Sequence, residues 1–545
     1  MIAHQIKTDI LIVGGGVGGC AAAMAASSMG VNVVLTETSH WLGGQLTSQA
    51  VPPDEHPWIE KYGRTARYQH YRQSIRAYYR THYPLKASAV SDPYFDPGRA
   101  TVSAICHEPR VALAVIDQML AFSRTSGRLR VLLSHEPVAT DIQGDCVRSV
   151  TLLDQEKGHH VIVEAAYILD ATEWGELLPL AGVEYVSGAE SQHDTGELHA
   201  VNGPAQPDNV QAMTWCFPLA FDPSPEANHV IEKPAQYEYW KQYSPHIAPP
   251  WTGSLLSWDA PHPITLAPRR FELFGDLAKG DFSSLWHYRR IICTDHYDVD
   301  QRPHEVTLVN WPQNDYFIAN VIDQPPDIVE RCFEEARQLS LSLVYWLQTA
   351  APHPDGKEGY PGLYMCPELT GRADGLALKP YVREARRIQA KRRVTENDLG
   401  FDAREGQPAQ TFTDSVGTGY YRIDLHPTTG GNNYIDIATM PFQIPLGALL
   451  PKRVKNVIAA GKCMGMTHIA NGCLRLHPVE WNIGESAGLL AAFCLSQNTC
   501  PHAVHADKTQ LSSYQTLLIA QGISLVWPDS VIQEHQQKMR IQNDI

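Results

Sequence analysis

The apolar positions near the start of the chain alternate with glycine in a way that predicts a compact unit. Residues 8–13 form a continuous apolar run, residues 17–29 are rich in alanine, and residues 31–37 form a second apolar run. Continuous apolar runs are typical of strands buried in a parallel sheet. Gly30 stands where a helix C-cap is expected. The pattern therefore predicts a βαβ unit of about 30 residues.

The same reading extends along the chain. A helix is expected to end near Gly127, and two alternating runs around residues 155–158 predict a β-hairpin. Near the C-terminus the pattern returns to strand, glycine and helix. The expected elements are helices at 109–124, 327–349 and 484–496, and strands at 129–133, 147–154, 160–169 and 454–460.

Between about residues 190 and 415 the chain changes character and becomes rich in tryptophan, proline and loops. Seven of the twelve tryptophans lie here: Trp215, Trp240, Trp251, Trp258, Trp286, Trp311 and Trp346. They suggest either an aromatic-walled cavity or the core of a separate domain, and the second reading is favoured. We expect an α/β protein with a Rossmann-like nucleotide-binding domain that is split in sequence by an inserted α+β substrate domain. The expected parts are residues 1–190, 191–415 and 416–500, followed by a helical tail at 501–545.

Length and charge agree with this organisation. A chain of 545 residues is too long for one compact core and suggests two or three domains. The net charge is 44 − 59 = −15. An acidic chain is a poor partner for nucleic acid or an anionic membrane, so neither is expected.

Cysteine and histidine usage indicates the compartment and argues against metal. The eleven cysteines include no C-x-x-C pair, and an odd count suits reduced thiols. No signal peptide and no membrane-length apolar run are found, the longest candidate being residues 487–494. None of the 24 histidines stands in a metal-ligand spacing. We expect a cytoplasmic protein without a metal.

The first candidate chemistry is the glycine pattern Gly14-x-Gly16-x-x-Gly19, which follows a strand and opens a helix. Its glycines allow a tight turn, backbone approach to a pyrophosphate and close helix–strand packing, and the helix N-terminus faces the phosphates. Glu37 ends the next strand, where a carboxylate accepts hydrogen bonds from ribose and repels a 2′-phosphate. NADP is therefore disfavoured, while NAD and FAD both remain. The candidate nucleotide-binding residues in this unit are Gly14, Gly16, Val17, Gly18, Gly19, Glu37 and Thr38.

Three later features favour FAD. The Gly43-Gly44-Gln45 segment suits a loop along a ribityl chain, and Asp170-Ala171-Thr172 resembles the A-T-G segment that returns to the adenosine side. A helix beginning near Gly484 is expected to point its positive end at the flavin N1/O2 edge. The candidate residues from these features are Gly43, Gly44, Gln45, Ala171, Thr172, Gly461, Arg475, Gly484, Ser486 and Ala487.

With these residues the chain resembles the FAD-dependent oxidoreductase family, within the superfamily of glutathione reductase, p-hydroxybenzoate hydroxylase and succinate dehydrogenase flavoproteins. The resemblance covers nearly the whole chain, and one departure is Glu173, where the A-T-G segment usually has glycine. It implies bound FAD and redox chemistry but little about the reaction, because the family is mixed in substrate. Its marks are residues 43–45, 106–110, 170–176, 310–316, 381–387, 423–426 and 453–495.

Catalytic candidates come from a basic segment and two histidines. Residues 379–393 carry seven basic residues and one acid, which suggests structural ion pairing or a nucleic-acid patch, and residues 381–388 alternate like a strand. The resemblance places Arg383 near the flavin, as a candidate for a substrate carboxylate or the flavin. His426 and His468 are candidate bases, although a lone histidine is more often a satisfied hydrogen-bonding group.

The predicted function is a dehydrogenase, oxidase or desaturase that moves a hydride from a CH–CH, CH–NH or CH–OH unit of a small molecule to flavin N5. No second G-x-G-x-x-G follows a strand, so electrons are expected to pass from substrate to FAD and then to oxygen or an electron-acceptor protein. Two alternatives stay open: a monooxygenase that uses NAD(P)H transiently, and a flavin-binding assembly or RNA-modification factor. Covalent attachment of FAD and homo-oligomerisation are also left open.

Overall fold

The computed structural model describes residues 4–275, 284–298 and 304–543. Its centre is a seven-stranded sheet in the order β3-β2-β1-β6-β5-β4, with β21 added beside β6. The neighbours β3, β2, β1, β6 and β21 run parallel, while β4 and β5 are antiparallel. The strands are β1 (His4–Val13), β2 (Val33–Glu37), β3 (Leu129–Leu133), β4 (His135–Gln143), β5 (Cys146–Asp154), β6 (His159–Asp170) and β21 (Val457–Ala459).

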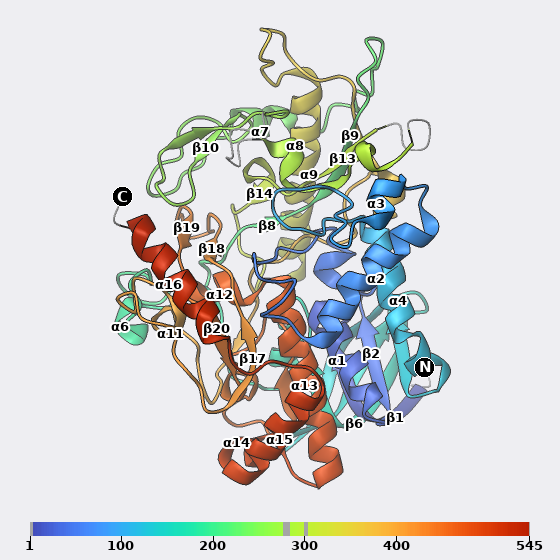
Figure 1. Ribbon diagram of the computed structural model, residues 1–545, viewed down its shortest axis with the longest axis vertical. Helices are drawn as coiled ribbons and strands as arrows, with labels where there is room; N and C mark the ends of the chain where they lie inside the picture. Colours follow the sequence, from blue (N-terminus) through green and yellow to red (C-terminus); the bar gives the residue numbers. More distant parts are fainter. Residues whose placement is uncertain (1–3, 276–283, 299–303, 544–545) are drawn as a thin grey trace.

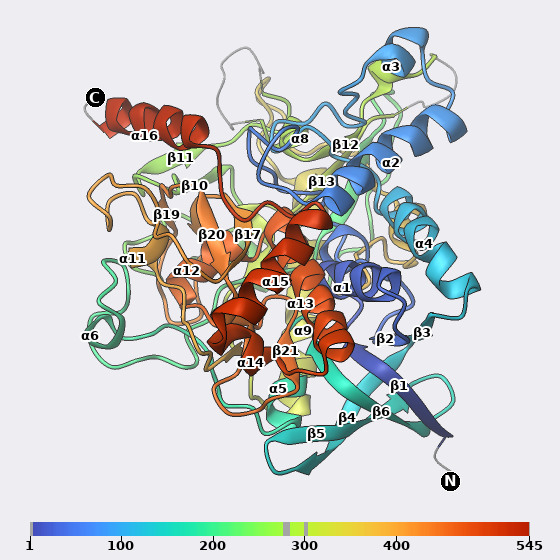
Figure 2. The same ribbon diagram turned by 60° about the horizontal axis from the view of Figure 1, so that its bottom comes forward.

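The parallel sheet is assembled from both ends of the chain. Val457 lies opposite Ile168 in the β21–β6 pair, although 289 residues separate them, and β1 pairs with β6 along its length. This confirms the α/β class, and the nucleotide-binding fold is split in sequence as predicted. The hairpin of β5 and β6 is also confirmed, whereas β4, which completes a three-stranded antiparallel extension (Figure 2), was not predicted.

One face of the sheet is covered by two helices that cross at glycine. Helix α1 (Val17–Ser28) packs on α13 (His477–Gln497), and in Figure 1 both lie beside the sheet in the lower half of the molecule. A Cβ atom on Gly484 would overlap the carbonyl oxygen of Gly18, and one on Gly488 would overlap that of Ala22. The two backbones therefore touch because these positions carry no side chain.

The predicted helix start near Gly484 is wrong. Helix α13 begins at His477 with Pro478 in its first turn, where a proline is tolerated because its missing N–H has no helical partner. Gly484, Ser486 and Ala487 consequently lie inside the helix, and the Ser486 hydroxyl donates to the carbonyl of Val416 at 2.8 Å. The positive end of α13 is at Leu476–His477.

A second hydrophobic core lies in the upper half of Figure 1. An antiparallel sheet in the order β12-β13-β9-β15 packs near α9 (Pro326–Thr349), which buries a stripe at residues 332, 336, 339, 343 and 347. All seven tryptophans of the region belong to this core and are buried. They therefore fill a core, as we expected, and do not wall a cavity. Its strands are β9 (Phe217–Phe221), β12 (Arg290–Ile292), β13 (Val306–Val309) and β15 (Leu363–Met365).

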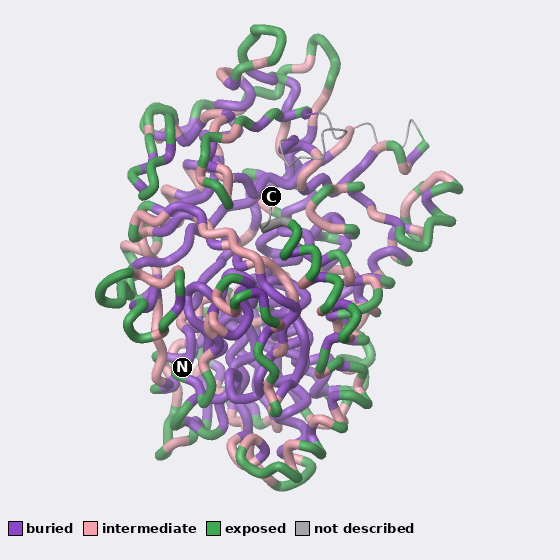
Figure 3. The backbone as a smooth tube through the Cα atoms, turned by 60° about the vertical axis from the view of Figure 1, so that its left-hand side comes forward, coloured by how far each residue is buried: buried purple, intermediate pink, exposed green. Residues whose placement is uncertain are grey.

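Further helices and short strands complete the fold, and Figure 3 shows the buried backbone at the centre with exposed loops around it. The domain limits at 190, 415 and 500 stay predictions. These elements are α2 (Ala66–His82), α3 (Ala87–Ser91), α4 (Pro109–Thr125), α5 (Leu177–Leu180), β7 (Tyr185–Val186), α6 (Gln192–Thr195), β8 (Met213–Thr214), α7 (Tyr237–Gln242), β10 (Asp259–Pro261), β11 (Pro268–Arg270), α8 (Leu285–Tyr288), β14 (Asp315–Tyr316), α10 (Pro367–Thr370), β16 (Arg387–Ile388), α11 (Glu396–Leu399), β17 (Ser415–Gly419), β18 (Ile423–Leu425), β19 (Ile435–Ile437), β20 (Phe442–Pro445), α12 (His468–Leu474), α14 (Pro501–Ala506), α15 (Lys508–Ala520) and α16 (Asp529–Asn543).

The predicted strand at 381–388 is wrong over most of its length, because only Arg387–Ile388 forms a strand, paired with β7. Its backbone bonds to scattered partners, such as Tyr381 N to the carbonyl of Thr214 at 2.7 Å. Its arginines form ion pairs, as the structural reading of the basic segment expected. The pairs are Arg383–Asp315, Arg386–Asp323, Arg387–Glu190, Arg387–Glu384 and Arg392–Asp398.

No helix within the described ranges is long and apolar enough to cross a membrane. Among the same residues, no group of three or more histidine, cysteine, aspartate or glutamate side chains is placed to hold a metal ion.

Candidate functional site

The turn between β1 and α1 has no room for side chains. Gly14 has a φ of 101°, and a Cβ there would overlap the carbonyl of Ala171. A Cβ on Gly19 would overlap the carbonyl of Gly14, which confirms its packing role. Gly16 is the N-cap of α1 and has no side chain to cap the helix, while the N–H of Gly18 donates to Glu480 Oε1 at 3.5 Å. The turn therefore presents a helix N-terminus, which attracts anions.

Glu37 lies at the end of β2 beside this turn. Its carboxylate accepts hydrogen bonds from the backbone N–H groups of Gly15, at 3.0 Å, and Ser39, at 2.8 Å. The side chain is buried, and this burial raises the pKa of Glu37. The backbone bonds fix its orientation, so it faces the cavity that the turn borders.

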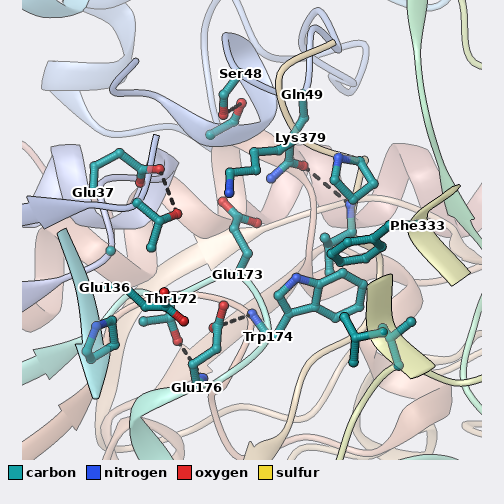
Figure 4. Close-up of a pocket in the computed structure, with 18 of the residues that line it drawn as sticks. Glu37, Ser48, Gln49, Glu136, Thr172, Glu173, Trp174, Glu176, Phe333 and Lys379 are labelled. Carbon is teal, nitrogen blue, oxygen red and sulfur yellow. Dashed lines mark hydrogen bonds between the residues drawn. The ribbon is translucent and has the colours of Figure 1, made fainter. Parts of the chain in front are cut away.

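A cavity of about 630 Å³ runs from this turn toward the N-terminal part of α9. Figure 4 shows Glu37 and Thr172 on one side, Trp174 and Phe333 on the other, and Glu173 between them. The predicted residues that line it are Gly14, Glu37, Thr38, Gly44, Ala171 and Thr172. The other predicted residues lie outside this lining: Gly16, Val17, Gly18, Gly19, Gly43, Gln45, Arg383, His426, Gly461, His468, Arg475, Gly484, Ser486 and Ala487.

Behind the glycine turn lies a small charged cluster. Lys462, which follows Gly461, forms an ion pair with Glu173. Its Nζ atom also lies 3.5 Å from Glu480 Oε2. The Gln45 amide donates to Glu480 and to the carbonyl of Arg475, at 3.1 Å. Burial is the main cause that raises the pKa of Glu480. This cluster joins the glycine turn to Arg475.

Arg475 leads to a second polar cluster, which we call the His426 cluster: Asp315, Arg383, Asp424, His426 and Arg475. His426 Nδ1 lies 2.5 Å from Asp315 Oδ2, and Asp315 also pairs with Arg383 at 3.1 Å. Asp424 Oδ2 lies 3.7 Å from His426 Nε2 and 3.6 Å from Arg475 Nη2. Asp315 and Arg383 are fully buried, whereas the side chains of His426 and Asp424 are 19 % and 28 % exposed.

Neighbouring positive charges lower the pKa of both carboxylates in this cluster. Burial alone would raise the pKa of Asp315, but Arg383 and His426 together hold it below its ordinary value. The pKa of Asp424 lies well below its ordinary value because His426 and Arg475 outweigh the effect of burial. Both side chains therefore accept hydrogen bonds and donate none.

His468 belongs to a different network. Its Nδ1 lies 2.9 Å from Glu384, whose other ion pair is with Arg387, and its own backbone N–H donates to Glu190. Burial raises the pKa of Glu384, but His468 and Arg387 lower it to about 2. His468 is 4 % exposed. The side chain of His426 is thus partly exposed, whereas that of His468 is buried.

The family comparison shows which family the chain belongs to. The model of the family described as "FAD dependent oxidoreductase" matches residues 9–512. The chain belongs to this family of FAD-dependent enzymes.

Other comparisons add little to the family match. No curated protein matches the chain. Similar solved structures include L-proline dehydrogenase from P. horikoshii, at 12 % identity and a TM-score of 0.18, covering 34 % of this chain and 25 % of that one. A geranylgeranyl bacteriochlorophyll reductase-like protein from Thermoplasma acidophilum has 9 % identity and a TM-score of 0.34, covering 95 % and 85 %. A variant of the quinol fumarate reductase FrdA from E. coli has 11 % identity and a TM-score of 0.31, covering 95 % and 74 %.

The residues present fit FAD. Bare glycines surround the helix N-terminus, Glu37 is available to ribose hydroxyls, and the amide oxygen of Gln45 is buried without a hydrogen-bond partner. Lys462, Glu480, Asp315 and Asp424 lie in segments that carry the family resemblance, but the sequence assigned none of them a role. A lysine directly after the glycine of a strand-to-helix turn was a usable signal for Lys462, whereas Asp315 is 111 residues from its partner His426.

Proposed function

We propose that, among the dehydrogenase, oxidase and desaturase activities that the sequence predicts, this FAD-dependent enzyme is a dehydrogenase or oxidase, and that it oxidises a CH–OH unit of a small organic molecule. The observation that carries the proposal is the pairing of the partly exposed His426 with the buried Asp315. FAD, when bound, supplies the hydride acceptor at N5. The electrons then go to oxygen or to an acceptor protein.

The contacts of His426 support a role as the base in this proposal. Asp315 is ionised and can only accept a hydrogen bond, so His426 Nδ1 donates to it. Nε2, which lies 3.7 Å from Asp424 Oδ2, is the ring nitrogen that can exchange a proton with a substrate. A buried carboxylate behind a histidine orients the ring and stabilises its protonated form. An alcohol needs such a base, because its hydroxyl proton must leave as the hydride is transferred. A saturated carbon chain has no O–H or N–H proton to give.

Neighbouring groups suit a hydroxyl-bearing substrate. The hydroxyl of Tyr434 is buried without a hydrogen-bond partner, and its ring lies 5.6 Å from that of His426. The charges of the His426 cluster nearly balance, since Asp315 and Asp424 face Arg383 and Arg475. A donor in Tyr434 and acceptors in His426 and Asp424 match an alcohol better than an anion.

The test is anaerobic reduction of the bound flavin, followed by its absorbance, with panels of alcohols, amines and saturated carboxylic acids. We expect an alcohol to bleach the flavin and His426→Asn to slow this step by roughly 10²–10⁴-fold. His193→Asn, at a side chain that is 95 % exposed, is the matched control and leaves the rate unchanged. Bleaching by NADPH alone would favour a monooxygenase, and an unchanged rate in His426→Asn would refute the assigned base.

A further inference from the structure

The carboxylate of Glu173 lies over the glycine turn. Its Oε1 atom is 2.6 Å from the place that a Cβ on Gly16 would take and 2.5 Å from the corresponding place on Gly44. Gly16 is the N-cap of α1, and the backbone of Gly44 faces it. The same Oε1 is buried and has no hydrogen-bond partner. An anionic side chain therefore covers the surface on which the glycine pattern is built to receive a phosphate.

The cation beside this carboxylate is shared with a second one. Lys462 is 1 % exposed and pairs with both Glu173 and Glu480, whose side chains are 20 % and 3 % exposed. Coulombic attraction to these carboxylates raises the pKa of Lys462 although burial opposes it, so the lysine is charged. One cation thus faces two carboxylates before any phosphate arrives.

We propose that Glu173 and the pyrophosphate of FAD compete for the same place above Gly16 and Gly44. In this view FAD binds by displacing the Glu173 carboxylate, and Lys462, still held by Glu480, then faces the phosphates. Two negative charges in contact repel each other strongly in a buried site, so the Glu173 carboxylate and a phosphate cannot occupy this place together. Glu173, which stands where the A-T-G segment usually has glycine, is a positioning residue that weakens cofactor binding.

The test measures binding of FAD, ADP and adenosine to flavin-free protein by calorimetry. Glu173→Gln keeps the size of the side chain and removes its charge, so we expect about tenfold tighter binding of FAD and of ADP. Adenosine carries no phosphate, and its affinity is expected to stay the same. Glu226→Gln, which removes an exposed carboxylate outside the lining of this cavity, is the control for net charge and is expected to change nothing.

Two further variants complete the test. Glu173→Gly restores the usual residue of the segment and should also tighten ADP binding, whereas Lys462→Gln should weaken it. Melting curves establish whether each variant is folded. If Lys462→Gln is unfolded, the two Glu173 variants decide the question. Unchanged or weaker ADP binding in both Glu173 variants would overturn the proposal. This result does not depend on which substrate the enzyme oxidises.

Discussion

A single buried histidine gives a residue-scale prediction about acid stability. His107 is 1 % exposed, its Nε2 lies 2.9 Å from the hydroxyl of Tyr71, and burial lowers its pKa from 6.5 to about 4. Between these values the unfolded chain binds a proton that the folded chain does not. The contribution of His107 to stability is therefore complete above pH 6.5 and falls as the pH drops toward 4, by on the order of 3 kcal/mol.

The variant His107→Gln cannot take up this proton. It is expected to be less stable than the unmodified protein at pH 7, and the difference in unfolding free energy should shrink by on the order of 3 kcal/mol near pH 4. Urea unfolding at several pH values measures it. His193→Gln serves as the exposed control. A difference that stays constant between pH 7 and pH 4 would show that folded His107 titrates normally.

At the same scale, the sequence predicts residues whose role follows from local geometry. Gly14, Gly19 and Glu37 were found because strand, glycine turn and helix are adjacent in the chain, and the structure gives each a contact that a side chain or another residue type would break. Asp315 and Asp424 had no such signal. Their importance depends on tertiary contacts with His426, and spacing along the chain does not encode those contacts.

At the scale of elements, the crossing of α1 and α13 gives the sharpest prediction. Helix propensity alone would make Gly484→Ala stabilising by about 1 kcal/mol. The added Cβ overlaps the carbonyl of Gly18, so we expect the opposite sign, a loss of roughly 1–3 kcal/mol as the helices separate. Thermal melting measures it. A Gly484→Ala variant that melts at a higher temperature than the unmodified protein would contradict the packing account.

Whether an element is buried on one face or all round explains how well the sequence predicts it. Strands and helices with one buried face, such as α9 and the hairpin of β5 and β6, carry a clear period and were predicted closely. Helix α13 is buried nearly all round and has no period, so its glycines were taken for its start. The segment at 381–388 alternates because its arginines reach separate carboxylates, and this imitates a strand.

At the scale of the whole molecule, the cavity lies between the two hydrophobic cores. Val13 and Ala171 on one side belong to the core of the parallel sheet, while Trp174 and Phe333 on the other pack against the tryptophan-rich core. A ligand that contacts both sides couples their unfolding, because it binds only when both are folded. Such a ligand stabilises the folded state by about 4 kcal/mol at a thousandfold excess over its Kd.

Calorimetry of the protein with and without FAD tests this coupling. With FAD we expect one unfolding transition, and without it two, because each core then melts at its own temperature. ADP is the control ligand, since it ends at the pyrophosphate and reaches the glycine turn without the flavin. It should raise the temperature of one transition and leave the other where it was. A single transition in the flavin-free protein, or merging by ADP as complete as by FAD, would mean that direct contact between the cores already couples them.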